Sequence, residues 1–436
     1  MPVPDESLTT SLHQFQAHRR HKVPYLRASE GKPTNAKPCI RASRLVIEIW
    51  FLVLLLRGYS SAVCCLQTSP ASTVSSSPEE KDSFLGDLAC RPCHEDKFSA
   101  YLATAHHRTS KLPDETAIAG SFTKGKNVMT TFNPELTFLM EEHDGQFYQT
   151  AIRQKNDHLT KHKEQMDLVI GSATKGQTYL YWKTNGLFEL PVSYWTQLHH
   201  WVNSPGYVDG SADFDRPVLP RCLECHATYF QPTTSSPAEN HYNREKIVLG
   251  ISCERCHGPG MEHVKSHSTN SIERKTMPPL GLSRDRQIDV CAQCHGGAGE
   301  PIAPAFSFRP GEKLSEYVRL QPPNATDRLD VHGNQVNLLE RSRCFQASPQ
   351  MSCATCHDVH MPERPAADYS ARCLGCHRVD RCGMFGKVGN KIASNCIDCH
   401  MPVQPSNNLV LDADNRRLQA NVRNHWIRVY ANAFHP

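Results

Sequence analysis

Residues 253–263 read CERCHGPGMEH, and this stretch decides what kind of fold the chain can adopt. It holds two cysteines three positions apart, a histidine directly after the second cysteine, and another histidine six residues later. The pattern Cys-x-x-Cys-His occurs seven times in 436 residues. Chance would supply roughly 0.05 copies at this composition, so the repeats reflect one chemical requirement met seven times.

The seven copies are numbered motif 1 to motif 7 in chain order. They are Cys90-Cys93-His94, Cys222-Cys225-His226, Cys253-Cys256-His257, Cys291-Cys294-His295, Cys353-Cys356-His357, Cys373-Cys376-His377 and Cys396-Cys399-His400. Two thiols at this spacing can each form a thioether to one of the two vinyl groups of a haem, and the next histidine then reaches the iron. The sequence therefore predicts seven covalent haem c groups, each with one axial ligand set by its motif.

Two other uses of paired cysteines compete with this interpretation. Zinc ribbons also repeat Cys-x-x-Cys, but zinc does not require a histidine directly after every second cysteine. A disulfide inside every motif would be strained and easily reduced. We therefore expect haem and no zinc.

A second histidine on each iron would complete its coordination, whereas an open position would admit a substrate. Seventeen histidines lie outside the motifs, which is enough for full ligation. The candidates for the second, distal ligand are His106 (or His107 beside it), His263, His360, His425, His332, and His199 (or His200 beside it).

Spacing limits how these histidines pair. His357 and His360 are three apart, so on a helix they share one face and cannot lie on opposite sides of one iron. His94 and His106 are twelve apart, roughly 18 Å along a helix, and they too must serve different haems. Such ligation from one motif to the next would hold the haems close together, as electron hopping requires.

Five cysteines lie outside the motifs. Cys39, Cys64 and Cys65 fall in or beside the N-terminal segment. Cys344 and Cys382 remain, and the sequence leaves open whether they form a disulfide in an oxidising compartment or stay as free thiols.

The N-terminal segment has the order of an export signal. Residues 45–56 are apolar apart from Glu48, basic residues precede them, and small residues follow at 60–62. We expect residues 1–66 to be a leader and residues 67–83 a Ser/Pro-rich linker. The protein is then periplasmic or otherwise exported, or held at the inner membrane if the apolar run stays as an anchor. Without residues 1–62 the formal charge changes from +4 to −1, so nothing indicates a nucleic-acid partner.

The rest of the chain predicts a mainly α fold with irregular loops, packed around covalent haems. Hydrophobic residues make up 39% of the chain and aromatic residues 8%, which is lean, so the haems would supply core material. Residues 95–110 have helical periodicity. Residues 121–190 contain β-prone pieces and the turn dipeptides Asp144-Gly145 and Asn185-Gly186, which predict a small antiparallel insert.

Several stretches resemble the cytochrome c-554 family of multihaem c-type cytochromes. They are ISCERCHGPGMEHV, CLECHAT, CAQCHG, MSCATCHDVH, the β region IGSATKGQTYLYWKTNGLFELPVSYW with LHHWVNSPGY, and NCIDCHMP followed by NHWIRVY. The resemblance implies mostly bis-histidine haems in stacked pairs, with His106, His263, His360 and His425 as distal ligands, and NHWIRVY supplying the distal histidine of the C-terminal haem. The Pro-containing stretch from Pro301 to Pro323 is the expected joint between a c-554-like domain at 84–300, with motifs 1–4 and the insert at 121–190, and a C-terminal haem lobe at 301–436 with motifs 5–7.

Together these features predict a periplasmic seven-haem cytochrome that carries electrons to and from redox partner proteins and is not itself an enzyme. The alternative is an oxidoreductase in which one open haem acts on a small nitrogen or sulfur compound.

Overall fold

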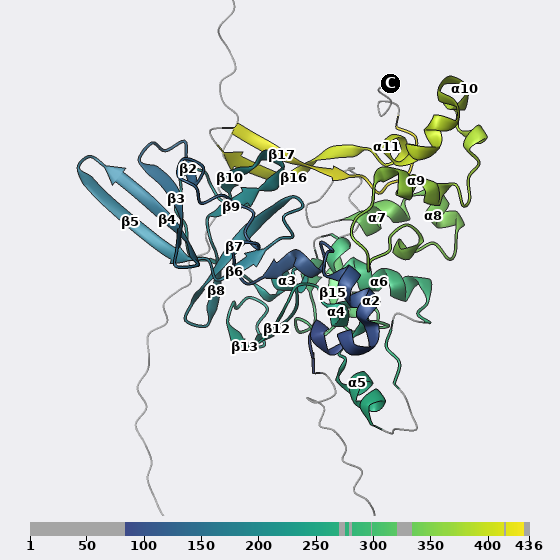
Figure 1. Ribbon diagram of the computed structural model, residues 1–436, viewed down its shortest axis with the longest axis horizontal. Coiled ribbons are helices and arrows are strands. Elements are labelled where there is room, and N and C mark those ends of the chain that lie inside the picture. The colour runs from purple at the N-terminus through teal and green to yellow at the C-terminus, as the bar shows by residue number, and fades with distance from the viewer. Residues whose placement is uncertain are drawn as a thin grey trace, which may run out of the picture. The chain divides into compact units, whose positions relative to one another are not determined.

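The computed structural model describes residues 83–269, 275–278, 281–297, 299–320, 334–413 and 416–430. Figure 1 shows a β-rich part built from residues 110–217 and a part of short helices that contains most of the motifs. Within the described residues no helix is both long and apolar enough to span a membrane. The apolar run at 45–56 lies outside the described residues.

The prediction of a mainly α fold is wrong, because helices and strands contribute about equal shares. The β insert is larger than residues 121–190, and further strands follow motifs 2 and 7. Three of the helices that carry motif residues, α3, α4 and α11, have only five residues each. A haem motif needs only one helical turn, so seven motifs do not require long helices.

The insert consists of two antiparallel sheets. One is the meander β2 (Val128–Thr130), β3 (Leu136–His143), β4 (Gln146–Lys155) and β5 (His158–Gln165). The other has the order β1-β6-β7-β8-β11, with β9 paired to β7 and β10. Its strands are β1 (Ser110–Lys111), β6 (Leu168–Ile170), β7 (Gly176–Lys183), β8 (Gly186–Glu189), β9 (Val192–Trp195), β10 (His200–Asn203) and β11 (Arg216–Pro217).

One apolar core joins the two sheets. Phe138 and Met140 from β3 pack with Tyr179 from β7 and Trp201 from β10, and all four are almost completely buried. The turn between β3 and β4 is the predicted Asp144-Gly145, with positive φ at both residues, as a type I′ turn requires. The turn between β7 and β8 lies one residue earlier than predicted, because Lys183 pairs with Gly186.

Among the described residues that follow the insert, the motif-bearing part contains nine α-helices and three hairpins, the last of them near the C-terminus. The helices of the whole described chain are α2 (Arg91–Tyr101), α3 (Pro220–Glu224), α4 (Cys253–His257), α5 (Met261–Ser268), α6 (Arg284–His295), α7 (Gln335–Glu340), α8 (Arg343–Ala347), α9 (Ala366–Cys373), α10 (Phe385–Val388) and α11 (Cys396–His400). The hairpins are β12 (Ala227–Pro232) with β13 (Tyr242–Leu249), β14 (Gly299–Pro301) with β15 (Val318–Leu320), and β16 (Val403–Ala413) with β17 (Arg416–Arg423).

The predicted helix at 95–110 begins earlier and ends earlier than expected. Helix α2 starts at Arg91, with a proline in its first turn, and ends at Tyr101. Its backbone leaves helical geometry at His94, where motif 1 ends.

The C-terminal hairpin extends from motif 7 to the β insert, as the yellow strands in Figure 1 show. Leu411 and Ala420 from β16 and β17 form a small core with Trp195 and Val202. The Asn203 side-chain amide also donates to the main-chain oxygen of Asp412 at 3.2 Å. The last haem motif is thereby tied to a sheet that lies far from it in the sequence.

Candidate haem sites

Motifs 1, 5 and 6 each form a tight turn that brings the histidine back over the first cysteine. The main-chain N–H of His94 donates to the oxygen of Cys90 at 3.0 Å, and His357 does the same to Cys353 at 2.9 Å. Cysteines at positions i and i+3 of such a turn face the same side. The local geometry therefore presents two thiols and an imidazole together, as attachment to one haem requires.

Four motif histidines face a histidine from elsewhere in the chain. The imidazole ring centres lie 6.0–6.4 Å apart in all four pairs. The pairs are His94 with His263 (6.4 Å), His106 with His295 (6.0 Å), His257 with His360 (6.0 Å) and His357 with His425 (6.3 Å). Three of these pairs have rings within 34° of parallel, and His106 and His295 are nearly perpendicular.

This spacing fits an iron between the rings. A metal-bound imidazole nitrogen lies about 2 Å from its metal, and the ring centre lies about 1 Å further out. Two imidazoles on opposite sides of one iron therefore have centres about 6 Å apart. The donor chemistry also fits, because haem iron accepts histidine on both axial sides.

The other ring nitrogen of several of these histidines is held by the chain. A metal-binding histidine normally uses one nitrogen for the metal and donates from the other to an oxygen. Here Nδ1 is the held atom, which leaves Nε2 for iron. The contacts are His263 Nδ1 to Lys275 O (2.7 Å), His425 Nδ1 to Arg423 O (3.2 Å), His400 Nδ1 to Arg428 O (2.9 Å), His295 Nδ1 to Gln335 Oε1 (3.4 Å) and His257 Nδ1 to Pro278 O.

Burial keeps two of the distal candidates neutral. It lowers the pKa of His106 to about 4, with a further contribution from nearby His295. It likewise lowers the pKa of His425 to about 4, although the hydrogen bond to Arg423 O acts in the opposite direction. A neutral imidazole has the lone pair that a metal needs, so both are suited to ligation near neutral pH.

Motifs 2, 6 and 7 supply the other three motif histidines. His226 Nδ1 lies 3.3 Å from the hydroxyl of Thr109. His377 is exposed, and His400 is half-buried against the C-terminal segment. The distal ligands of these three motifs stay a prediction.

Of the other predicted distal candidates, His199 is described without a motif histidine beside it, and His332 stays a prediction. His199 lies exposed after β9, in left-handed conformation, and among the described residues no motif imidazole stacks on it. His332 falls in the segment 321–333, outside the described residues.

Thiols of different motifs lie side by side. Cys90 of motif 1 contacts Cys253 of motif 3. The same holds for motifs 2 and 4, motifs 4 and 5, and motifs 6 and 7. These contacts are Cys225 with Cys294, Cys291 with Cys353, and Cys373 with Cys396.

Cys344 and Cys382 are both free thiols in the structure. Cys344 lies within electrostatic range of Cys356 and Cys373, which belong to motifs 5 and 6. Cys382 lies near Cys396 and Cys399 of motif 7. The two thiols therefore lie near different motifs.

Buried charged residues, which were not among the predicted site residues, join the motifs. Glu254, inside motif 3, is 2% exposed, and its carboxylate accepts from the main-chain N–H groups of Leu85, Gly86 and Gly260 at 2.8–3.0 Å. Asp87 accepts from the N–H of Cys253 at 2.9 Å. These contacts fasten the segment before motif 1 to motif 3.

Motifs 2, 3 and 4 are joined in the same way. The Arg255 guanidinium, 6% exposed, donates to the main-chain oxygen of Glu224 at 2.8 Å. The Arg221 guanidinium donates to the oxygen of Gln293 at 2.9 Å. The charged residues at the variable positions of CLECH and CERCH could have indicated these contacts between motifs, since a charged side chain that is buried requires a specific partner.

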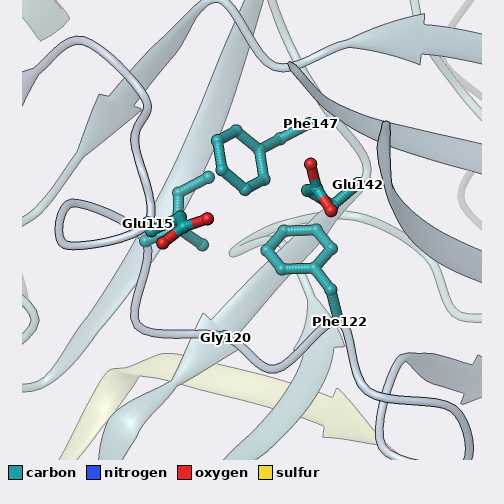
Figure 2. Close-up of a pocket in the computed structure, with 6 residues that line it drawn as sticks. Glu115, Gly120, Phe122, Glu142 and Phe147 are labelled. Atoms are coloured by element: carbon teal, nitrogen blue, oxygen red, sulfur yellow. The ribbon is translucent and has the colours of Figure 1, made fainter. Parts of the chain in front are cut away.

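A surface pocket in the β insert is unrelated to these sites. Phe122 and Phe147 contact each other at 5.0 Å between ring centres, with two glutamates beside them, as Figure 2 shows. The lining residues are Glu115, Ile118, Gly120, Phe122, Glu142 and Phe147, with no histidine or cysteine.

Known proteins with similar sequences are multihaem cytochromes. The family model for cytochrome c554 and c-prime matches residues 200–258, which include motifs 2 and 3. The C-type polyheme cytochrome OmcC of Geobacter sulfurreducens is 26% identical over 156 residues, covering 31% of this chain and 20% of that protein. The multiheme cytochrome MtrA of Shewanella baltica is 22% identical over 161 residues, covering 36% of each protein.

The chain therefore matches only a fifth and about a third of the length of these two relatives. A solved structure has a similar fold: the outer cell wall cytochrome OcwA superimposes with a TM-score of 0.50 over 79% of each chain, at 18% identity. With the seven motifs and the paired imidazoles, these matches identify the chain as a multihaem c-type cytochrome that resembles the cytochrome c-554 family.

Proposed function

We propose that the seven motifs hold seven covalent haem c groups and that the chain carries electrons between redox partner proteins. The observation that carries this proposal is the set of four imidazole pairs at the spacing of two axial ligands. An iron with two histidine ligands has no position for a substrate and suits electron transfer.

The bound haem would supply an iron that changes by one electron between its ferric and ferrous states. The chain supplies everything else. The fourteen motif cysteines would keep the haems from dissociating, and each motif histidine would ligate one iron. The second ligands at motifs 1, 3, 4 and 5 would be, in that order, His263, His360, His106 and His425. The main-chain oxygens on Nδ1 fix the orientation of the imidazoles.

The thiol contacts support a continuous route. Motif 1 adjoins motif 3, Cys256 of motif 3 lies within electrostatic range of Cys291 of motif 4, and motif 4 adjoins motif 5. Cys356 of motif 5 lies near Cys373 of motif 6, which adjoins motif 7. Motif 2 adjoins motif 4 as a side branch. No motif is isolated, as a conduit requires.

The location and the domains remain part of this proposal. Covalent haem c and a leader at 1–66 favour a place outside the cytoplasmic membrane of a bacterium, with the linker at 67–83 preceding the haem-binding part. A c-554-like domain at 84–300 and a C-terminal lobe at 301–436 remain the proposed division. OcwA, whose fold is similar, is an outer cell wall cytochrome, and this supports an exported location here.

The spin state of each iron tests this proposal against the enzyme alternative. We expect the purified holoprotein to show predominantly low-spin haem, with no response to nitrite or hydroxylamine. His360→Ala should convert one haem, that of motif 3, to a high-spin centre that binds carbon monoxide when reduced. His158→Ala, an exposed histidine on β5, is the matched control and should change nothing.

A wild-type protein with a high-spin haem that responds to those compounds would favour the oxidoreductase. A His360→Ala protein with an unchanged low-spin spectrum would refute the pairing of His257 with His360.

A further inference from the structure

Residues 424–428 (Asn-His-Trp-Ile-Arg) run between motif 5 and motif 7. The centre of the His425 ring lies 6.3 Å from the centre of the His357 ring in motif 5. Three residues later, the main-chain oxygen of Arg428 accepts from Nδ1 of His400 in motif 7 at 2.9 Å. The resemblance implied that this segment supplies the distal histidine of the C-terminal haem, whereas the geometry places His425 opposite His357 of motif 5.

One buried hydroxyl holds the motif 5 side of the segment. The Ser342 hydroxyl donates to the main-chain oxygen of His425 at 3.3 Å and accepts from the N–H of Ile427 at 2.8 Å. Ser342 is completely buried. Ser342 therefore binds the main chain on both sides of Trp426, the residue directly after the candidate ligand His425.

Ser342 also lies at the start of helix α8, where a serine hydroxyl ordinarily caps the helix. It is the N-cap residue of helix α8 (Arg343–Ala347), and a serine there usually accepts from a helix N–H. Here the side chain makes no cap hydrogen bond. The hydroxyl is committed to the His425 segment, so its removal leaves the helix cap unchanged.

The motif 7 side is held by main-chain hydrogen bonds. The N–H of Arg428 donates to the oxygen of His400 at 3.2 Å, and the N–H of Asn424 donates to the oxygen of Pro402 at 3.1 Å. The Asn424 side chain, 1% exposed, accepts from the N–H of Trp426 at 2.9 Å.

Trp426 completes the attachment with two cations. The guanidinium carbon of Arg341 lies 3.7 Å from the centre of its ring system, and that of Arg428 lies at the same distance. Arg341 directly precedes Ser342, so the same two residues before α8 contact the segment by a hydroxyl and by a cation–π interaction.

We propose that residues 424–428 form one positioning element for two haems, with Ser342 and Trp426 as the positioning residues that keep His425 on the iron of motif 5 and His400 oriented at motif 7. This inference rests on the proposed function, because it assumes that motifs 5 and 7 carry haem. It goes beyond that function because Ser342 and Trp426, which contact neither iron, would position histidines at two haem sites at once.

The test compares holoproteins by intact mass, by spin state, and by the rate at which the reduced protein binds carbon monoxide. Ser342→Ala removes two buried hydrogen bonds, and we expect roughly tenfold faster carbon monoxide binding at one haem in seven. Ser204→Ala is the matched control. Ser204 is a buried serine of the β insert whose hydroxyl donates to Leu190 O at 2.8 Å, and its loss should leave the binding rate unchanged.

A second pair of variants covers the case in which Ser342→Ala does not accumulate. Trp426→Ala should also release His425 and shift the reduction potential of a second haem through His400, while Trp426→Phe keeps an aromatic ring and should retain most of the wild-type behaviour. Trp182→Ala is the control, since Trp182 also carries an arginine, Arg244, on its ring but lies in the β insert.

The outcomes separate the two proposals. A wild-type protein without haem mass contradicts the proposed function itself. A wild-type protein with seven haems, together with Ser342→Ala and Trp426→Ala proteins that keep the wild-type spectrum, potentials and carbon monoxide rate, overturns the positioning role alone.

Discussion

Glu254→Gln tests how strongly the segment before motif 1 depends on motif 3. The carboxylate accepts three main-chain N–H groups, from Leu85, Gly86 and Gly260, all at 2.8–3.0 Å. A glutamine side chain keeps one oxygen but directs an NH2 group at one of these donors. Because the site is 2% exposed, water does not compensate for the lost acceptor.

The expected cost follows from that count. A hydrogen bond to a charged group contributes about 1.5–3 kcal/mol and a neutral one about 1 kcal/mol. Losing one charge-assisted bond and weakening two others should lower the free energy of unfolding by about 2–4 kcal/mol. Gly260 precedes helix α5, which carries His263, so the haem of motif 1 should also become more reactive to carbon monoxide.

The assay is urea unfolding of the purified holoprotein, followed by absorbance and circular dichroism. Glu239→Gln, at an exposed glutamate, is the control and should change the free energy of unfolding by less than about 0.5 kcal/mol. If Glu254→Gln unfolds at the wild-type midpoint with an unchanged slope, the carboxylate does not fasten motif 3 to the N-terminal segment.

Three further predictions concern other parts of the structure. Burial alone would raise the pKa of Asp87, but hydrogen bonds lower this pKa below the ordinary 3.8. The stabilising contribution of the Asp87 carboxylate is therefore present above pH 3.8 and is lost as the pH falls through the lowered pKa. Asp87→Asn should weaken this acid dependence in unfolding curves, and an unchanged curve would contradict the prediction. Gly120→Ala places a methyl group against the indole of Trp201 and should lower the free energy of unfolding by about 1–3 kcal/mol, whereas an unaltered midpoint would show that the indole moves aside. Cys382→Ser should keep the full haem mass, because two thiols suffice for each haem, and loss of one haem would show that Cys382 takes part in attachment.

The local part of each site could be predicted from the sequence, because the motif spacing fixes it. Two cysteines and a histidine within five residues form a turn whatever surrounds them, and the turns at Cys90 and Cys353 have this form. The turn at Asp144-Gly145 was predictable for the same reason, since only certain residues favour positive φ.

The pairing of distant histidines could not be predicted in this way. His263 faces His94 and His425 faces His357, although each pair is widely separated in the chain. Spacing along the chain excludes some pairs, such as His357 with His360. Which motif histidine a distal histidine does face is decided by how the motifs pack against one another. The buried carboxylate of Glu254 shows the same limit, because two of its hydrogen-bond donors, the N–H groups of Leu85 and Gly86, lie far from it in the sequence.

The fold class was mispredicted for a related reason. Strand β13 (Tyr242–Leu249) has a polar run at 243–246 before an apolar run at 247–249, so its sequence lacks the alternation of a half-buried strand. Pairing with β12 stabilises it, and β17 (Arg416–Arg423) is paired with β16 in the same way. Strands are the main regular structure between motifs 1 and 3 and after motif 7, whereas short helices separate the later motifs.

The intact mass of the purified holoprotein, made in a host that matures c-type cytochromes, tests the central claim most directly. The account predicts the mass of the mature chain plus seven haems, and loss of one haem when both cysteines of a single motif are replaced by alanine. A colourless protein with the mass of the bare chain would contradict it.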